Sequence, residues 1–206
     1  MAKSEFSINI INKEECKDIL SKYHYLSSIS KGFKSGVNFG LVQNGNIVGV
    51  CIFTGFPVPE LVKSIFGLDR NNQEGMFELS RLCLCPSVQS SEINITSWFV
   101  SKCIKTLRKT RKVSAILSYA DSDFHSGVIY RALNFKYYGL SAPKKDFYVE
   151  LDNGEFSKLS RGKTKGIKGE WRDRSRKHRF LLVFDKKLNV LWDEVKKGAF
   201  APLLLC

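Results

Sequence analysis

Residues 113–140 read VSAILSYADSDFHSGVIYRALNFKYYGL, and the order of patterns in this stretch decides the fold. An apolar run of strand length leads to an Asp-Ser-Asp turn that begins at Asp121. Apolar residues at i, i+1, i+4 and i+5 from Val128 then predict a helix, which ends at Asn134. The tyrosine-rich segment 136–140 begins another strand. The stretch therefore predicts a strand–helix–strand unit with an acid, a histidine and a tyrosine at one junction.

Two interpretations of this junction are open. In the first, Asp121 and His125 cap the helix of an ordinary βαβ unit. In the second, they form a functional site together with Tyr130, because a buried strand that delivers such groups to one junction is suited to chemistry. The pattern alone favours neither.

Length and composition predict a single domain. With 206 residues, 43% hydrophobic and 26% charged, the chain is expected to be a soluble globular protein with a sizeable core. No stretch approaches the roughly 20 apolar residues of a membrane span, and the first residues lack the apolar core of a signal peptide. We therefore expect a cytoplasmic protein without a membrane partner. The sequence does not determine the oligomeric state, and a homodimer is left open.

The cysteines do not indicate a metal site. Six cysteines lie mostly inside apolar runs and form no Cys-x-x-Cys pair, and the chain has three histidines. This usage favours reduced cysteines that serve as small core residues. No Cys/His metal site is therefore expected.

The charge balance is the first indication of a partner. The chain has 33 Lys and Arg against 20 Asp and Glu, a net charge of +13, which favours a polyanion such as nucleic acid. Residues 155–180 carry ten of these basic residues and three acidic ones. Because 180–184 reads as a strand, the segment is predicted to be a long loop anchored at both ends that follows a phosphate backbone. Its candidate DNA-contacting residues are Lys163, Lys165, Lys168, Arg172, Arg174, Arg176, Lys177 and Arg179.

The first half of the chain predicts a helix, a hairpin and an aromatic cluster. Asn12 and the Glu three residues later form a capping box before a helix over 12–23. His24 and Tyr25 follow it, and they can serve either as packing and a helix cap or as a stacking platform for a base. Residues 37–53 predict a β-hairpin with Asn-Gly at its turn.

Residues 77–85 predict a central strand that contains two charged residues. Strict alternation places Glu78 and Arg81 on opposite faces, and each must be paired or used, because burying either alone is costly. The helix that follows has a polar beginning, including Asn94 and Ser97, which can bind an anion or simply cap the helix. Further on, 136–151 predicts a second hairpin.

The order helix, hairpin, strand, helix, strand, helix, hairpin resembles the GNAT acyltransferase fold. That resemblance implies an α/β protein with a mixed, mostly antiparallel central sheet flanked by helices. Six short runs, spread over about residues 20–180, are similar to the Mom family of phage DNA-modification proteins. The runs are Tyr23-His24-Tyr25-Leu26, Glu78-Leu79-Ser80-Arg81-Leu82, Ser97-Trp98-Phe99, Ser118-Tyr119-Ala120-Asp121, the stretch from His125 to Asn134-Phe135, and Arg176-Lys177-His178-Arg179-Phe180.

The resemblance to the Mom family implies an enzyme that converts adenine in DNA to N6-carbamoylmethyl adenine and so protects phage DNA from host restriction. It implies a GNAT-like catalytic domain over 1–154, with 155–206 as a basic DNA-contacting segment and a strand packed on the same domain. If the chain is encoded by a phage, it acts in the host cytoplasm. The partners implied are DNA and an acyl-CoA donor.

The resemblance carries functional positions over to His24, Tyr25, Arg81, Ser97, Asp121 and Tyr130. The roles expected for them and for neighbouring candidates follow from the chemistry of an adenine amine. Asp121 accepts the proton of the adenine amine, with Glu78 as a second candidate base. Tyr130, or the less favoured His125, protonates the leaving group. The remaining positions divide between an extruded base and the acyl-CoA. His24 and Tyr25 hold the base, and the cofactor-binding residues are Arg81, Ser97, Asn94 and Tyr119.

The donor and two competing functions are left open. GNAT proteins have closely spaced glycines in their pyrophosphate loop, whereas 86–97 has none, so acetyl-CoA or another acyl-CoA is an open assignment. A bound iron is also open, without support from a ligand pattern. The first alternative function is an ordinary acyl-CoA-dependent N-acyltransferase that acts on a protein or a small amine. The second is a non-catalytic DNA-binding protein.

Overall fold

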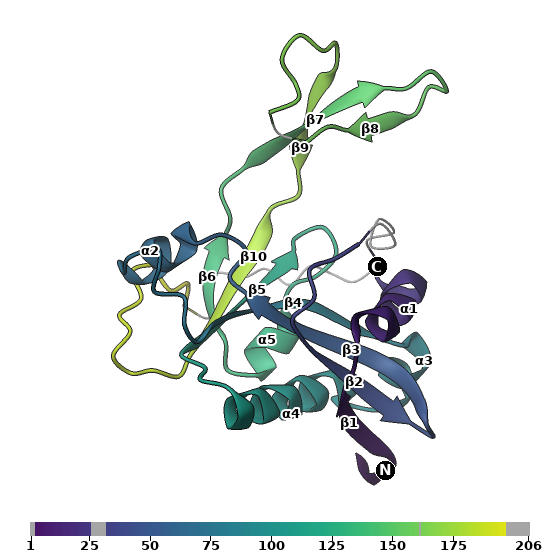
Figure 1. Cartoon of the computed structure of the whole chain (residues 1–206), viewed down its shortest axis with the longest axis vertical. Helices are drawn as coiled ribbons and strands as arrows, with labels where there is room; N and C mark the ends of the chain where they lie inside the picture. Colours follow the sequence, from purple (N-terminus) through teal and green to yellow (C-terminus); the bar gives the residue numbers. More distant parts are fainter. Residues whose placement is uncertain (1–2, 26–31, 161, 197–206) are drawn as a thin grey trace.

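The chain folds into one seven-stranded sheet with helices on both faces and a second, three-stranded sheet that projects from it (Figure 1). The computed structural model describes residues 3–25, 32–160 and 162–196. The strand order is β1-β2-β3-β4-β5-β10-β6 in the large sheet and β8-β7-β9 in the small one. The expected α/β class, with a mixed and mostly antiparallel sheet flanked by helices, is therefore confirmed.

The elements have the following bounds. The helices are η1 (Lys3–Glu5), α1 (Lys13–Tyr23), α2 (Glu60–Phe66), α3 (Pro86–Ser91), α4 (Ile95–Thr110) and α5 (Val128–Ala132). The strands of the large sheet are β1 (Phe6–Ile10), β2 (Val37–Gln43), β3 (Asn46–Gly55), β4 (Met76–Leu84), β5 (Ala115–Asp121), β6 (Lys136–Leu140) and β10 (Lys177–Val183). Those of the small sheet are β7 (Lys144–Glu150), β8 (Phe156–Lys158) and β9 (Glu170–Arg174). No helix of the described residues is long and apolar enough to cross a membrane.

Two local predictions are confirmed by their capping and turn geometry. Helix α1 begins with the predicted box, in which Asn12 accepts from the amide of Glu15 and the Glu15 side chain accepts from the amide of Asn12. Strands β2 and β3 pair as a hairpin. Its Asn44 and Gly45 have φ of 50° and 79°, the left-handed values that a tight two-residue turn requires.

The large sheet divides between β4 and β5. These two strands are parallel and pair from Met76 with Ala115 as far as Leu79 with Ser118. Beyond that point β4 is still paired with β3 and β5 with β10, but β4 and β5 no longer pair with each other. The central strands therefore open toward their carboxyl ends.

Helices cover both faces of the sheet and fix which side chains are buried on each. One core includes Phe99 and Leu107 of α4 together with Ile116 of β5 and Phe180 of β10. On the other face, α1 and α2 pack separate clusters against the strands, and Leu117 belongs to the α2 cluster. Neighbouring residues of β5 therefore lie in opposite cores, as expected for the apolar run of a strand that is buried on both faces.

The predicted alternation of β4 is wrong because the strand contains a β-bulge. Leu79 is opposite Phe53 and Arg81 is opposite Ile52, so Ser80 is the extra residue. The bulge shifts the alternation by one residue. Glu78 and Arg81, which strict alternation places on opposite faces, therefore lie on the same face as α1 and α2.

The predicted hairpin over 136–151 is also wrong. Strand β6 pairs with β10, whereas β7 pairs with β8 and β9. The segment 141–143, which ends in Pro143, therefore leads the chain out of the large sheet and not back along β6. The basic segment 155–180, predicted as a loop, contains β8, β9 and the start of β10.

Candidate functional site

Several of the predicted functional side chains meet where β4 and β5 separate. The Tyr25 ring, which follows α1, is stacked on His24 with 4.5 Å between ring centroids. It also contacts two side chains of the turn after β5, with centroids 4.7 Å from Phe124 and 5.1 Å from His125. The turn after β5 and the end of α1 thus form one aromatic cluster, His24–Tyr25–Phe124–His125. Phe124 was missed by the sequence analysis, because only the fold brings it to Tyr25.

Glu78 and Arg81, together called the acid–base pair, lie half-buried on the α1 face of the sheet. Burial raises the pKa of Glu78, although the positive charges of Arg81 and Lys34 partly oppose the shift. Arg81 donates from Nη1 to the carbonyl oxygen of Ser80 at 2.6 Å. Its Nε is buried and has no hydrogen-bond partner among the described residues. An unsatisfied guanidinium donor beside a carboxyl group of raised pKa is suited to binding an acceptor atom of a ligand.

His24 of the aromatic cluster is neutral near pH 7. Burial lowers the pKa of His24 to about 4, and the charges of Arg81 and His125 act in the same direction. Burial also lowers the pKa of His125, against the attraction of Asp121. The pKa of Tyr25 is raised by burial and by Asp121, so its phenol keeps its proton. The cluster is therefore an uncharged aromatic surface, and Tyr25 and Phe124 are 40% and 57% exposed.

Asp121 ends β5 inside a network of donors. It is 4% exposed and forms an ion pair with Lys177, while Ser175 donates to the same oxygen at 3.0 Å. The amide of Asp123 donates to its other oxygen at 3.2 Å. Burial alone would raise the pKa of this carboxyl, but the hydrogen bonds from Lys177, Ser175 and Asp123 hold it below its ordinary value. Asp121 is therefore a stabilised carboxylate and a weak base.

The partners of Asp121 were missed by the sequence analysis, which assigned Lys177 to DNA contact. The residue is directly opposite Asp121 in the pairing of β10 with β5. Lys177 and Asp121 are 56 residues apart in the sequence, and the small sheet lies between them in the chain. A local sequence pattern therefore does not predict that they pair. The only local signal for the position of Lys177 is the alternating sequence of β10, which places Lys177 and Arg179 on one face of that strand.

Tyr130 lies on the opposite side of the opening. Its ring packs against Phe135 and Phe180, at centroid distances of 5.6 and 5.0 Å. Burial raises the pKa of Tyr130 to about 12, although a hydrogen bond with Ser118 opposes the shift. Ser118 in turn donates to the carbonyl of Leu79 at 3.0 Å, at the last paired position of β4 and β5. The phenol is therefore a protonated donor at the point where the strands divide.

A glycine fixes the start of the short helix that carries Tyr130. Gly127 has a φ of 74°, and a Cβ atom at this position would lie 2.2 Å from the Phe180 ring. A side chain is therefore excluded both by the backbone conformation and by the packing.

Tyr119 belongs to the acid–base face and not to a phosphate site. It follows the same side of β5 as Asp121, two residues away. Burial raises its pKa to about 12, with Glu78 acting in the same direction and Arg179 opposing. Arg179 donates to the carbonyl of Tyr138 at 2.5 Å and stacks over Trp192 at 4.4 Å.

The start of α4, predicted to bind the cofactor, is only partly suited to phosphates. Asn94 has a left-handed φ of 59° and accepts from the Ser97 hydroxyl at 3.1 Å. The chain before it forms helix α3 and a turn with buried Glu92. Residues 85–94 contain no Lys or Arg. These residues offer the amides of a helix N-terminus but no positive side chain to the pyrophosphate of an acyl-CoA.

The predicted DNA-contacting residues separate into two groups. Lys163, Lys165 and Lys168 are exposed in the loop that joins β8 to β9. The others contact protein groups. Arg172 pairs with Glu170, Arg174 with Asp146 and Lys177 with Asp121, while Arg176 donates to the Ser141 carbonyl and Arg179 to that of Tyr138.

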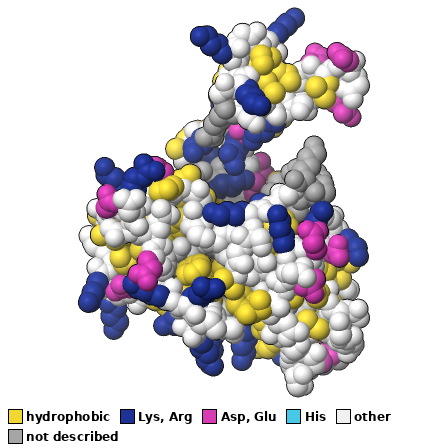
Figure 2. Space-filling model, in the orientation of Figure 1, with side chains coloured by type: hydrophobic (Ala, Val, Ile, Leu, Met, Phe, Trp, Pro, Cys, Tyr) yellow, Lys and Arg dark blue, Asp and Glu magenta, His cyan; other side chains and the backbone are white. Residues whose placement is uncertain are grey.

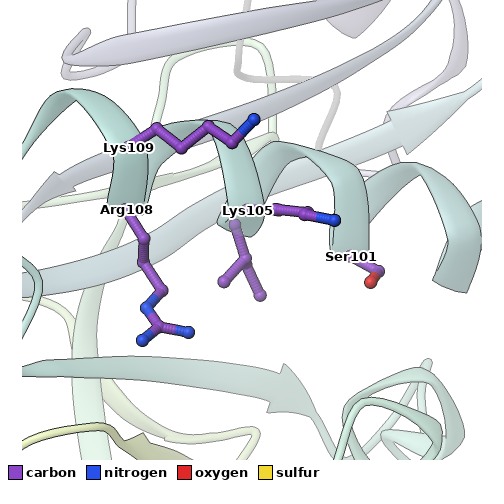
Figure 3. Close-up of a pocket in the computed structure, with 5 residues that line it drawn as sticks. Ser101, Lys105, Arg108 and Lys109 are labelled. Carbon is purple, nitrogen blue, oxygen red and sulfur yellow. The ribbon is translucent and has the colours of Figure 1, made fainter.

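Two other features bear on ligands. Within the described residues, no group of three or more His, Cys, Asp and Glu side chains is placed to hold a metal ion. On the outer surface of α4, Ser101, Lys105, Arg108 and Lys109 line an open hollow (Figure 3). Arg108 there stacks over Phe184 at 4.1 Å. This hollow is basic and lies on the face of the sheet opposite the acid–base pair.

The fold is shared with acetyltransferases of known structure. The ribosomal-protein-S18-alanine N-acetyltransferase of Escherichia coli is 13% identical, with a TM-score of 0.51 over 86% of this chain and 93% of that chain. A GNAT family acetyltransferase of Elizabethkingia anophelis, solved with acetyl-CoA bound, is 11% identical, with a TM-score of 0.51 over 88% of this chain and 100% of that chain. An IAA acetyltransferase of Bacillus cereus is 13% identical, with a TM-score of 0.52 over 87% of this chain and 99% of that chain. At these identities the similarity establishes the fold alone.

The sequence itself gives the narrower assignment. No curated protein sequence matches the chain. The sequence profile of the Mom protein family matches residues 5–197, which include both the aromatic cluster and the acid–base pair. The chain therefore belongs to the Mom protein family.

Proposed function

We propose that this protein transfers a carbamoylmethyl group to the exocyclic amine of adenine in DNA, and so protects phage DNA from host restriction. The observation that carries the proposal is the placement of an exposed aromatic cluster beside Glu78 and Arg81, where the sheet opens. Membership of the Mom family and the net charge of +13 support it.

The aromatic cluster is suited to an extruded base. The adenine amine is inaccessible inside a stacked duplex, so an enzyme acting on it must turn the nucleotide out of the helix. Tyr25 and Phe124 offer exposed aromatic area on which a purine can stack. Because His24 is neutral, it can exchange hydrogen bonds with the base without a charge.

Glu78 is the better candidate for the proton acceptor. The lone pair of the adenine amine is delocalised into the ring, so the amine must lose a proton as it attacks. A carboxylate whose pKa is raised by burial is a stronger base than one held low by a lysine, which distinguishes Glu78 from Asp121. In the proposed step the nitrogen–carbon bond forms at the methylene of the donor, and the amine proton goes to Glu78. The carbon–leaving-group bond breaks, and the protonated Tyr130 hydroxyl stabilises the leaving group.

Asp121 has a positioning role in this scheme. Its carboxylate links the end of β5 to Lys177 and Ser175, and it precedes the turn that carries Phe124 and His125. Loss of this anchor would displace the aromatic cluster without removing a reacting group.

An acyl-CoA remains the donor class that the fold suggests, since the Elizabethkingia anophelis relative was solved with acetyl-CoA bound. The opening between β4 and β5 would admit the amide-bearing part of such a molecule. Because residues 85–94 bring no positive side chain to its phosphates, no chemical step is assigned to it. A carbamoylmethyl group also joins nitrogen through a methylene carbon, so simple acyl transfer does not produce it.

The test is mass spectrometry of nucleosides from plasmid DNA of cells that express the chain. Wild type should produce a deoxyadenosine species with an added carbamoylmethyl group. Glu78→Gln and Tyr130→Phe, each close in shape to the original residue, should produce little or none while staying folded. Unmodified DNA from folded wild-type protein would reject the proposal.

The fold favours one alternative, an N-acyltransferase acting on a protein or a small amine. That function needs the opening between β4 and β5 but not the basic loop 162–169. Removing the lysines of that loop would then leave turnover unchanged, whereas a DNA-modifying enzyme should lose activity on long DNA.

A further inference from the structure

The small sheet β8-β7-β9 forms an arm, residues 144–174, that projects from the large sheet between β6 and β10 (Figure 1). Two short links join it to the body. At their meeting point the amide of Ser141 donates to the Lys177 carbonyl at 2.8 Å, and the Lys177 amide donates to the Ser141 hydroxyl at 3.0 Å. Ser175, in the second link, donates to Asp121. The base of the arm is therefore attached to the end of β5, beside the candidate site.

The charges of the arm separate into two ends. The turn between β7 and β8 carries Glu150, Asp152 and Glu155, all exposed. The loop between β8 and β9 carries Lys163, Lys165 and Lys168, and its described residues include no acid. Figure 2 shows Lys and Arg side chains around the upper end of the arm and acidic side chains at its right-hand tip. A polyanion would be attracted by one end and repelled by the other.

The strands of the arm contribute little free charge. Arg172 pairs with Glu170, Lys145 with Asp173, and both Lys158 and Arg174 with Asp146. Lys144, at the base of the arm, is the strand cation without an ion pair among the described residues. The three loop lysines have no ion pair within the part of the chain that is described. The basic loop, defined as residues 162–169, is therefore the positive surface of the arm.

The exposed aromatic rings of the arm, Phe156 and Trp171, lie on its strands and not in the basic loop. Arg172 lies over Phe156 at 3.8 Å and over Tyr148 at 5.0 Å from the ring centroids, and Trp171 packs edge-on against Phe147 at 5.1 Å. Binding of single strands depends on rows of open rings, whereas lysine ammonium groups bind phosphates without reading bases. The basic loop has three lysines and no aromatic residue, so this loop favours the backbone of a duplex over the bases of a single strand.

The length of the arm sets how far from the target adenine this contact lies. The basic loop joins the sheet where Lys158 and Glu170 both pair with Tyr148, seven residues beyond Ser141. At the rise of a strand this is roughly 23 Å. At 3.4 Å for each base pair, this length corresponds to about seven base pairs.

We propose that the basic loop holds the phosphate backbone of double-stranded DNA on one side of the target adenine, roughly seven base pairs away. The acidic turn at the other end of the arm repels phosphates, so the duplex extends toward the basic loop and not toward this turn. This inference rests on the proposed function, in that DNA is the substrate, and it adds that the substrate is a duplex held from one side.

Two triple variants test the surface. Lys163, Lys165 and Lys168 are changed to Gln in one, and Lys102, Lys105 and Lys109 of α4 are changed to Gln in the other. Both remove three positive charges, but the second set lies on the outer surface of α4, away from the arm. Affinity for a duplex of about 30 base pairs is measured by fluorescence anisotropy at several salt concentrations. The loop variant should bind more weakly, with a salt slope smaller by about 2 to 3 units. The α4 variant should bind like wild type.

Equal losses in the two variants, or no loss in the loop variant, would overturn the proposal. Single-stranded DNA bound as tightly as the duplex, and weakened equally by the loop changes, would overturn the assignment of a duplex. Duplexes extended on only one side of the target adenine test direction. An extension on one side of the adenine should give tight binding and an extension on the other side should not. Equal affinity with either extension would contradict a one-sided contact.

The binding measurement separates this inference from the proposed function, because it requires no turnover. A loop-dependent duplex affinity without any modified adenine would reject the function and support the contact. If wild type and the loop variant modify adenine equally well on long DNA, the function is supported and the contact is rejected.

Discussion

Removing the cation that faces Asp121 should destabilise the protein in a pH-dependent manner. The chosen change is Lys177→Met, which keeps the length of the side chain. Asp121 is 4% exposed and the Lys177 side chain 25%, so the variant leaves a buried carboxylate without its counter-charge. Such a loss costs about 3 to 5 kcal/mol. Since Ser175 and the amide of Asp123 still donate to Asp121, we expect about 3 kcal/mol, the lower end of that range.

The pH dependence follows from the direction of the pKa shift. In wild type the pKa of Asp121 is below its ordinary value of 3.8, so its contribution to stability is present above that pH and is lost as the pH falls through the folded pKa. In the variant, burial dominates and raises the pKa. Protonation then relieves the buried charge, so the difference from wild type should shrink between pH 7 and about pH 5.

The assay is urea unfolding of both proteins at the two pH values. The control is Lys136→Met, which breaks the exposed pair with Glu194 and should cost less than about 1 kcal/mol. Adding Asp121→Asn to the variant removes the unpaired charge and should recover part of the lost stability. The reasoning is refuted if Lys177→Met costs no more than the control, or if its cost is independent of pH.

Three further predictions address the backbone, the histidines and the base. Gly127→Ala should destabilise by more than about 3 kcal/mol, because overpacking adds to the cost of a left-handed backbone. Gly45→Ala, which has open space, should cost about 1 kcal/mol in the same unfolding experiment. In an NMR titration His24 should stay neutral down to about pH 4, and stability should fall between pH 6.5 and 4 as the unfolded chain takes up protons; a midpoint near 6.5 would exclude its burial. The transfer rate should rise with pH through the raised pKa of Glu78 and then level off, and a rate that is flat from pH 4.5 upward would exclude this carboxyl as the base.

Local patterns were sufficient for the elements that are built from neighbouring residues. The capping box at Asn12, the Asn44-Gly45 turn and the strand that ends at Asp121 depend on short-range geometry, and each is observed. The mixed central sheet was instead implied by the resemblance of the element order to the GNAT fold, and it is observed.

The errors arose where one residue or one long-range pairing changes the outcome. The bulge at Ser80 inserts a single position into β4 and moves Arg81 to the face of Glu78, which strict alternation does not predict. The arm separates β6 from β10, so the position of Lys177 opposite Asp121 could not be found from the sequence. Charge density assigned that lysine to DNA, because the alternating pattern of β10 shows which face the lysine lies on but not that an acid lies opposite it.

The central claim is that the amine of adenine in DNA attacks the donor at this site. The most direct measurement uses a duplex whose adenines carry nitrogen-15 in the exocyclic amine, incubated with purified protein and the small-molecule fraction of the expressing cells. The digested nucleosides are then weighed by mass spectrometry. We expect a carbamoylmethyl deoxyadenosine that retains the label, formed by wild type and not by Glu78→Gln. A modified nucleoside without the label would show that the amine is replaced rather than alkylated, and no modified nucleoside from folded, DNA-binding protein would contradict the account.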